Sequence, residues 1–346
     1  MIGTVLAPPH PVLGADDRRH LAFEMQVVNL ARKPLTVQRI DTLDAGTGAV
    51  LASRDRADVA AALNRFGGGA FGATLAAGGA GVAILDVALP PRARLPRSIV
   101  QRITTTYTTA PYRTGAASVA SDPAVVVRPP LRGARWVDLN GCCATATSHR
   151  SGTEPINGAL HVPERFAIDF VRLDGSGRLF TGPANKLTSY RYFGTEVLSV
   201  ADGVVVGIQD GLPENVPGHL PPVVTPQNAG GNYVVVDIGD RHFAFYAHLQ
   251  PGSLRVTTGA RVRRGQVLGL LGNTGNSDAP HLHFHVMDRP SPLASNGLPF
   301  RFESFDSLGT VTNPGDLFAG KPVRVGGGLS GTHARQLPLN QQVVNF

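Results

Sequence analysis

Apolar and polar residues alternate in short runs over the first part of the chain, and turn-forming residues separate the runs. The pattern predicts strands at 21–28, 35–43, 49–51, 81–87 and 102–107. Only 54–66 has the apolar spacing of a helix. Short strands spaced by turns are typical of a sandwich, so residues 1–127 are expected to form an immunoglobulin-like β-sandwich that serves as a docking or scaffolding module.

A second β-rich region follows a stretch at 123–133 that contains Pro129, Pro130 and Gly133. Its pattern predicts strands at 166–173, 196–208, 232–239, 241–249, 267–271 and 281–288. Residues 209–231 are rich in Pro and Gly without periodicity, which indicates a long loop of the kind that often borders a site. The chain is therefore expected to be all-β, with a second domain at 128–346 whose core spans about 160–290.

Composition supports a globular protein and narrows its partners. The chain has 346 residues, enough for two domains, with 42% hydrophobic and 16% charged residues. Its formal net charge is +7, but the basic residues are scattered without interleaved aromatic residues, which argues against a nucleic-acid partner. A basic surface equally suits an anionic polymer such as a bacterial cell wall. No apolar run is long enough for an integral membrane segment, and no signal peptide is recognisable at the N-terminus.

Three histidines occupy alternate positions near residue 283. On a strand, His281, His283 and His285 would share one face, where imidazoles serve as metal ligands or as acid–base groups. Upstream, Asp169 interrupts an apolar strand. A buried carboxylate is costly unless it binds a cation or hydrogen-bond donors, so Asp169 is a second candidate for the same kind of site.

Other elements surround these residues in a fixed order. The segment Phe245-Tyr246-Ala247-His248-Leu249 is a strand that ends in a histidine. A turn and strand with glycines at the bends follow at 259–269, and 272–280 then leads directly into His281-Leu282-His283.

In this order and spacing, the sequence resembles the lysostaphin-type (LytM-like) zinc metallopeptidases, which cut peptides of bacterial peptidoglycan. The resemblance covers about residues 165–288 and implies one zinc ion per chain. In that family, zinc is held by the His and Asp of an H-x-x-x-D motif and by the second His of H-x-H. The resemblance thus implies that Asp169 and His283 are metal ligands, and that His248 and His281 are the catalytic pair.

The sequence departs from the family pattern at Arg165, which stands where the first ligand of H-x-x-x-D is expected. Arginine cannot bind zinc. The leading replacement is His149, because a hairpin turn at Asn157-Gly158 would fold 148–156 against 159–165. Pairing Ile156 with Ala159 puts Arg150 opposite Arg165, and a one-residue bulge would put His149 there instead. His161, His285, a cysteine or no replacement are the alternatives. His285 also departs from the family, which usually has Glu there, and its position suits a supporting role behind the ligands.

The leading function is therefore a zinc-dependent endopeptidase acting on peptidoglycan stem or bridge peptides, in the cell envelope or outside the cell. A family member that has lost zinc, and that binds peptidoglycan or a partner protein without cutting, is the alternative. A carbohydrate-binding or adhesive β protein is a third. His10 and His20 are expected to be solvated, and Cys142 and Cys143 to be either a vicinal disulfide or buried thiols.

Overall fold

The computed structural model describes residues 1–67, 70–143 and 146–346, and the chain divides into two compact units. One unit comprises Met1–Ala124 and Cys142–Arg165, and the other comprises Val125–Gly141 and Phe166–Phe346. The segment Cys142–Arg165, which the sequence analysis assigned to the second domain, thus belongs to the compact unit of the N-terminal strands.

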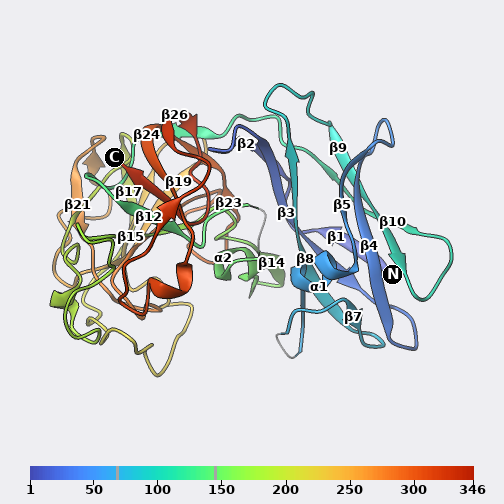
Figure 1. The fold of residues 1–346 in the computed structure, drawn as a ribbon, viewed down its shortest axis with the longest axis horizontal. Helices are drawn as coiled ribbons and strands as arrows, with labels where there is room; N and C mark the ends of the chain where they lie inside the picture. The colour runs from blue at the N-terminus through green and yellow to red at the C-terminus, as the bar shows by residue number, and fades with distance from the viewer. Residues whose placement is uncertain (68–69, 144–145) are drawn as a thin grey trace. The chain divides into compact units, whose positions relative to one another are not determined.

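Two antiparallel sheets form the first unit (Figure 1). One sheet contains β1 (Ile2–Val5), β2 (His10–Leu13), β3 (Arg19–Val28), β6 (Leu63–Arg65) and β8 (Ala80–Leu89). The other contains β4 (Leu35–Asp44), β5 (Val50–Arg54), β7 (Thr74–Leu75), β9 (Ser98–Thr105) and β10 (Tyr112–Ser118). Apolar side chains of both sheets fill one core, among them Phe23, Ile40, Leu85 and Ile103. This is the sandwich that the alternating pattern predicted.

The predicted helix at 54–66 is shorter than expected. α1 spans Arg56–Ala62, and Asp55 caps its N-terminus together with Asp58 in a capping box. The chain then enters β6 at Leu63, because Leu63 pairs with Ala83 of β8. The helix therefore ends where the chain pairs with β8, a strand that lies later in the sequence.

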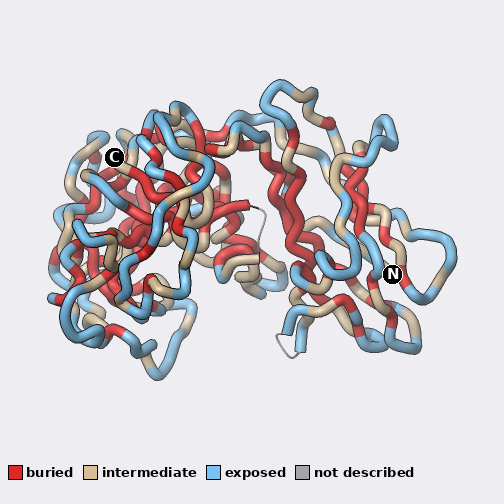
Figure 2. Tube along the Cα trace, viewed as in Figure 1, coloured by how far each residue is buried: buried red, intermediate tan, exposed pale blue. Residues whose placement is uncertain are grey.

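Most of β3 is buried (Figure 2), and alternation of its side chains gives the strand two buried faces of different character. Leu21, Phe23 and Met25 point into the sandwich core. His20 and Glu24 share the other face, yet they are only 4% and 0% exposed. The prediction that His20 is solvated is therefore wrong.

Residues 142–165 supply the partners of this second face. The segment contains α2 (Ser148–Ser151) and a hairpin of β13 (Glu154–Ile156) with β14 (Ala159–His161). Arg150 donates a hydrogen bond from Nε to Glu24 Oε1 at 3.1 Å, and Arg165 donates one from Nε to Glu24 Oε2 at 2.6 Å. Both guanidinium groups are buried, so Glu24 stands between two buried cations.

A large mostly antiparallel sheet dominates the second unit (Figure 1). Its continuous strand order is β11 (Val125–Val127), β24 (Phe300–Val311), β27 (Gln342–Asn345), β12 (Trp136–Leu139), β15 (Ile168–Arg172), β22 (Leu282–Met287), β19 (Phe243–Leu249), β18 (Asn232–Asp237), β17 (Gly203–Gln209) and β20 (Arg261–Val262). Three strands join at the side: β23 (Gly297–Leu298), β25 (Val325–Gly326) and β26 (Gly331–Gln336). A separate pair is formed by β16 (Glu196–Leu198) and β21 (Val267–Leu270), and two short helical turns lie at Leu187–Ser189 and Pro314–Asp316.

The all-β prediction is confirmed, and the strands predicted at 166–173, 232–239, 241–249 and 281–288 correspond to β15, β18, β19 and β22. These four strands lie in the centre of the large sheet, although β15 comes far earlier in the chain than its neighbour β22. Trp136, predicted as a core residue, is 0% exposed. In the part of the chain that the structure describes, no helix has the length and apolar character needed to cross a bilayer.

Candidate metal centre

Strand register places the candidate residues of the second unit in one row. Asp169 of β15 is opposite His283 of β22, and His283 is opposite Ala247 of β19. Ile168 and Phe170, on either side of Asp169, are 0% exposed, and so are Leu282 and Phe284 on either side of His283. The apolar residues therefore hold the strands against the core, while Asp169 and His283 share the opposite face.

Asp169 and His283 direct ligand atoms at the same point. His283 Nδ1 lies 3.0 Å from Asp169 Oδ1, and His281 Nε2 lies 3.3 Å from the same oxygen. Asn140, which follows β12, donates a hydrogen bond from Nδ2 to the other oxygen, Oδ2, at 2.9 Å. One carboxylate oxygen is thus oriented by an amide, while the second faces two imidazoles. This donor set fits a divalent metal such as zinc, because a carboxylate and an imidazole are both ordinary zinc ligands.

His248 stands at the end of β19, where the backbone turns with φ 64°. Its Nδ1 lies 2.7 Å from the carbonyl oxygen of Thr274, so Nδ1 carries the proton and Nε2 keeps its lone pair. The ring centroid lies 4.6 Å from that of His281 and 5.8 Å from that of His283. Burial lowers the pKa of His248 well below its usual value, and the neighbouring His281 and His283 lower it further.

His281 is oriented in a similar way, from the residue that precedes β22. Its Nδ1 is 2.9 Å from the carbonyl oxygen of Ala279 and 3.2 Å from the hydroxyl of Ser277. The carbonyl fixes the proton on Nδ1, so Nε2 is the nitrogen that faces Asp169. Two histidines therefore present Nε2 lone pairs beside the candidate metal position.

His285 lies behind His283 rather than beside Asp169. Its Nδ1 is 2.9 Å from His283 Nε2, and Phe245 packs on its ring with centroids 5.0 Å apart. A hydrogen bond to the distal nitrogen of a ligand orients the ligand ring and sets its tautomer. The structure thus places His285 where the sequence analysis expected a supporting group.

Arg165 binds residues of the first unit. Besides Glu24, its guanidinium donates to the carbonyl oxygens of Pro8 at 3.1 Å and Ala7 at 3.4 Å. Its fixed charge and its hydrogen-bond partners exclude Arg165 as a metal ligand.

The hairpin proposed for His149 is confirmed only in part. Ile156 pairs with Ala159 across the Asn157-Gly158 turn, as predicted, but the ladder ends at Glu154 and His161. His149 lies on α2, not on a strand, because Thr147 caps that helical turn by accepting a hydrogen bond from Arg150 N. His149 and His161 are both buried in the first unit.

Glu24, Asn140 and Thr274 also orient groups in the two units, and none of them was predicted from the sequence. Glu24 is a single carboxylate in the apolar run of β3. Because a buried carboxylate needs a partner, this position could have predicted a buried cation near Glu24. Asn140 and Thr274 lie outside the named strands, in loops, so local patterns do not reveal them.

The strand register and the donor atoms together make a candidate metal centre on a β-sheet, with one carboxylate and three histidines in or beside it. Residues 188–295 match Peptidase family M23, so the chain contains a domain of that family. The matched stretch includes His248, His281, His283 and His285. Asp169 and His149 precede it.

Among curated proteins, the chain is similar to the peptidoglycan DD-endopeptidase ShyA of Vibrio cholerae, with 37% identity over 100 residues that cover 29% of this chain and 19% of that protein. It is also similar to the glycyl-glycine endopeptidase ALE-1 of Staphylococcus capitis, with 39% identity over 74 residues and 20% of each chain covered. The chain therefore spans about a fifth of the length of these relatives. The lysostaphin catalytic domain from Staphylococcus simulans is similar at 26% identity, covering 41% of this chain and 78% of that one, with a TM-score of 0.25.

Proposed function

We propose that this protein is a zinc-dependent endopeptidase that hydrolyses peptide bonds in the stems or cross-bridges of peptidoglycan, in the cell envelope or outside the cell. The observation that carries the proposal is the convergence of His283 Nδ1 and His281 Nε2 on one oxygen of Asp169. The relatives add support, since the names of two of them specify cutting of peptidoglycan and of glycyl-glycine bonds.

Asp169 and His283 would hold the metal, with His149 as the third ligand. Two imidazoles and one carboxylate are a donor set suited to one zinc ion. Chain connectivity supports His149, because residues 142–165 leave β12 and return to β15, which are adjacent strands of the sheet. His161, His285 and an incomplete ligand set remain the competing assignments. Zinc bound by these residues would supply an acidic water molecule and polarise the scissile carbonyl.

His248 and His281 would do the proton work. With Nδ1 fixed as a donor to a carbonyl oxygen, each ring offers Nε2 to the reaction. One Nε2 accepts the proton of the attacking water, and the proton then passes to the leaving amine as the C–N bond breaks. The other, when protonated, donates a hydrogen bond to the oxyanion that develops on the carbonyl. The low pKa of His248 keeps that ring neutral and able to accept a proton.

Digestion of purified peptidoglycan tests this function. The wild-type chain should release new amino groups from the polymer, while Asp169→Ala and His283→Ala should release none. His242→Ala is the matched control, because His242 precedes β19 at the end opposite His248. Digestion by Asp169→Ala at the wild-type rate would contradict the proposal.

Arg165 favours one second candidate, a binding protein without hydrolytic activity. A chain that has lost the usual first ligand, and that uses Arg165 to bind Glu24, can keep the fold and lose the metal. Sedimentation of the protein with insoluble peptidoglycan, without release of amino groups and without bound zinc, would support that function instead.

A further inference from the structure

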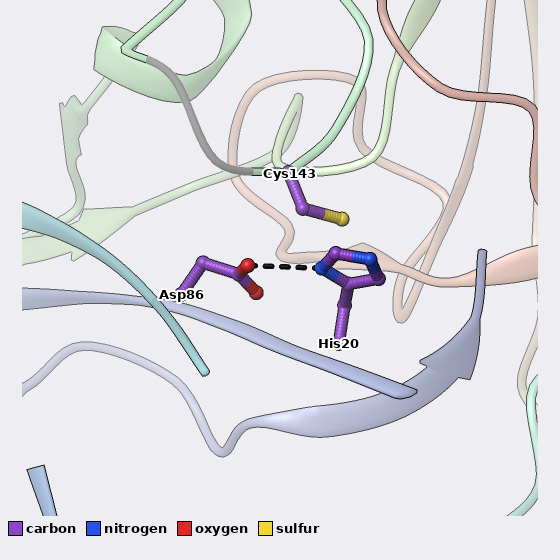
Figure 3. Close-up of side chains that lie close together, drawn as sticks. All are labelled: His20, Asp86 and Cys143. Atoms are coloured by element: carbon purple, nitrogen blue, oxygen red, sulfur yellow. Dashed lines mark hydrogen bonds and ion pairs between the residues drawn. The ribbon is translucent and has the colours of Figure 1, made fainter. Parts of the chain in front are cut away.

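A second group of metal-ligating side chains lies within the first unit, on the face of β3 and β8 that residues 142–165 cover. It consists of His20, Asp86 and Cys143 (Figure 3). Each residue offers one ligand atom, and these atoms all lie within 4.8 Å of one another. All three residues are buried, with exposed fractions of 4%, 8% and 5%.

Register explains how two of these residues meet. Ala22 is opposite Asp86, so His20 is the diagonal neighbour of Asp86 on the same face. His20 Nδ1 lies 2.9 Å from Asp86 Oδ2, and His20 Nε2 lies 3.1 Å from Asp16 Oδ1. Burial alone would lower the pKa of His20, but hydrogen bonds and charge from Asp16 and Asp86 raise it to about 9.

Asp86 has coordinating capacity that no neighbour uses. Its side chain is 4% exposed, and its Oδ1 has no hydrogen-bond partner among the described atoms. Leaving a buried carboxylate oxygen unsatisfied is costly, and a bound cation would remove that cost.

Cys143 is joined to Cys142 in a disulfide, so its sulfur is not a thiolate in this state. A thiol reductant R–SH would convert the pair by exchange: two R–SH and the disulfide give R–S–S–R and two cysteine thiols. The Cys143 thiol is then available as a ligand, because metal binding displaces its proton.

We propose that reduction of the Cys142–Cys143 disulfide opens a metal site of zinc-type chemistry formed by Cys143, His20 and Asp86. Sulfur, imidazole and carboxylate donors together suit zinc, with the fourth position taken by water or by Asp16. The site uses no residue of the candidate metal centre on β15 and β22.

The net charge of this buried region is the same before reduction and after metal binding, which supports the proposal. In the oxidised state, Asp16, Asp86 and a protonated His20 sum to a net charge of −1. In the reduced, metal-bound state, two carboxylates, one thiolate, a neutral imidazole and a divalent cation also sum to −1. Reduction followed by metal uptake, with release of one proton each from Cys143 and His20, therefore adds no net charge to this buried region.

The test uses the full chain carrying Asp169→Ala and His283→Ala. These substitutions remove the candidate metal centre on β15 and β22, so that any metal bound is bound outside that centre. Cobalt(II) serves as the spectroscopic substitute for zinc, and a phosphine reductant is used because dithiols bind zinc themselves. The oxidised protein should bind none at this site. The reduced protein should bind one equivalent, with a thiolate-to-cobalt charge-transfer band in the near ultraviolet.

Two isosteric variants separate the roles of the cysteines. Cys142→Ser leaves Cys143 as a permanent thiol and should bind one equivalent without reductant. Cys143→Ser should bind none in either state. Asp86→Asn in the Cys142→Ser background removes a proposed ligand, so it should weaken cobalt binding by at least the roughly 10- to 100-fold that loss of a group supporting a ligand costs.

Two results would overturn the proposal. One is a folded Cys142→Ser chain, checked by circular dichroism, that gives no charge-transfer band. The other is a band in that chain that Asp86→Asn and His20→Gln leave unchanged, which would mean that the thiol binds metal without the cluster.

Discussion

Single residues in this protein acquire their roles from hydrogen-bond partners, some near in sequence and others far from it. Asp41 of β4 is one example: its carboxylate accepts hydrogen bonds from Ser53 Oγ at 2.5 Å, from Arg39 Nε at 2.7 Å and from Arg102 Nη2 at 2.8 Å. His248 and His281 are others, since each ring is oriented by a carbonyl oxygen of a loop. His248 and His281 could be identified as site candidates from the sequence, because their spacing matches a known family. The role of His20 could not be predicted, because its local sequence pattern does not show that Asp16 and Asp86 are its partners.

Replacing His248 or His281 with alanine should remove activity without removing metal. Neither ring belongs to the proposed ligand set, and loss of a proton-transfer group typically lowers the rate 10²- to 10⁴-fold. Peptidoglycan digestion and metal content should therefore be measured on the same samples. Loss of zinc from both variants would show that these histidines act as ligands instead.

Asp41 should make the first unit sensitive to acid. Burial alone would raise the pKa of Asp41, but hydrogen bonds from Ser53, Arg39 and Arg102 lower it below its usual value. A lowered folded-state pKa stabilises the fold above the unfolded-state value, and this contribution disappears as the pH falls through the folded-state value. Asp41→Asn should thus lose stability at neutral pH and lose less on acidification than the wild type.

Urea unfolding at neutral pH and at about pH 3 measures this difference. Asp122→Asn is the control, because Asp122 is an exposed carboxylate of the same unit. Equal acid sensitivity of the Asp41→Asn variant and the wild type would contradict the assignment.

At the scale of elements, most strands could be predicted and their partners could not. Alternation located β4, β8, β15, β19 and β22 to within a few residues, because strand periodicity is a local property. The Asn157-Gly158 turn was found for the same reason. The packing of residues 142–165 on β3 could not be predicted, because Arg165 and Glu24 are 141 positions apart and no local pattern joins them.

The buried Arg150–Glu24–Arg165 group should contribute strongly to the attachment of residues 142–165 to β3. Glu24→Gln would leave two buried guanidinium groups without a countercharge, which typically lowers the free energy of unfolding by about 3–5 kcal/mol. Glu303 offers a matched control, since it also pairs with two arginines, Arg128 and Arg264, but at the surface. Glu303→Gln should cost no more than about 1 kcal/mol.

Chemical denaturation of both variants provides the comparison. Similar losses for Glu24→Gln and Glu303→Gln would mean that burial does not set the strength of the interaction around Glu24.

At the scale of the whole molecule, the candidate metal centre depends on sheet order. β15 and β22 are separated by more than a hundred residues, yet they are neighbours in the sheet, and this brings Asp169 to His283. Family resemblance identified both residues from the sequence. The resemblance could not identify the third ligand, because this chain has Arg165 where the family has its first ligand histidine.

Oxidised wild-type protein should contain one zinc ion per chain, and His149→Ala should lower its zinc affinity sharply. Loss of one of three protein ligands leaves too few donors for a stable site. His161→Ala is the matched control, since His161 is also a buried histidine of the segment Cys142–Arg165. Elemental analysis after dialysis measures both. Full zinc content in His149→Ala with loss in His161→Ala would transfer the assignment to His161.

The path of the chain through its two units limits how such a protein can be altered by recombination. The chain passes from one unit to the other three times, after Ala124, after Gly141 and after Arg165. A crossover after residue 124 strips the first unit of its segment 142–165, and one after residue 165 strips the second unit of β11 and β12. A crossover after residue 141 divides both. No single crossover can therefore transplant either unit intact, and the two must be engineered together.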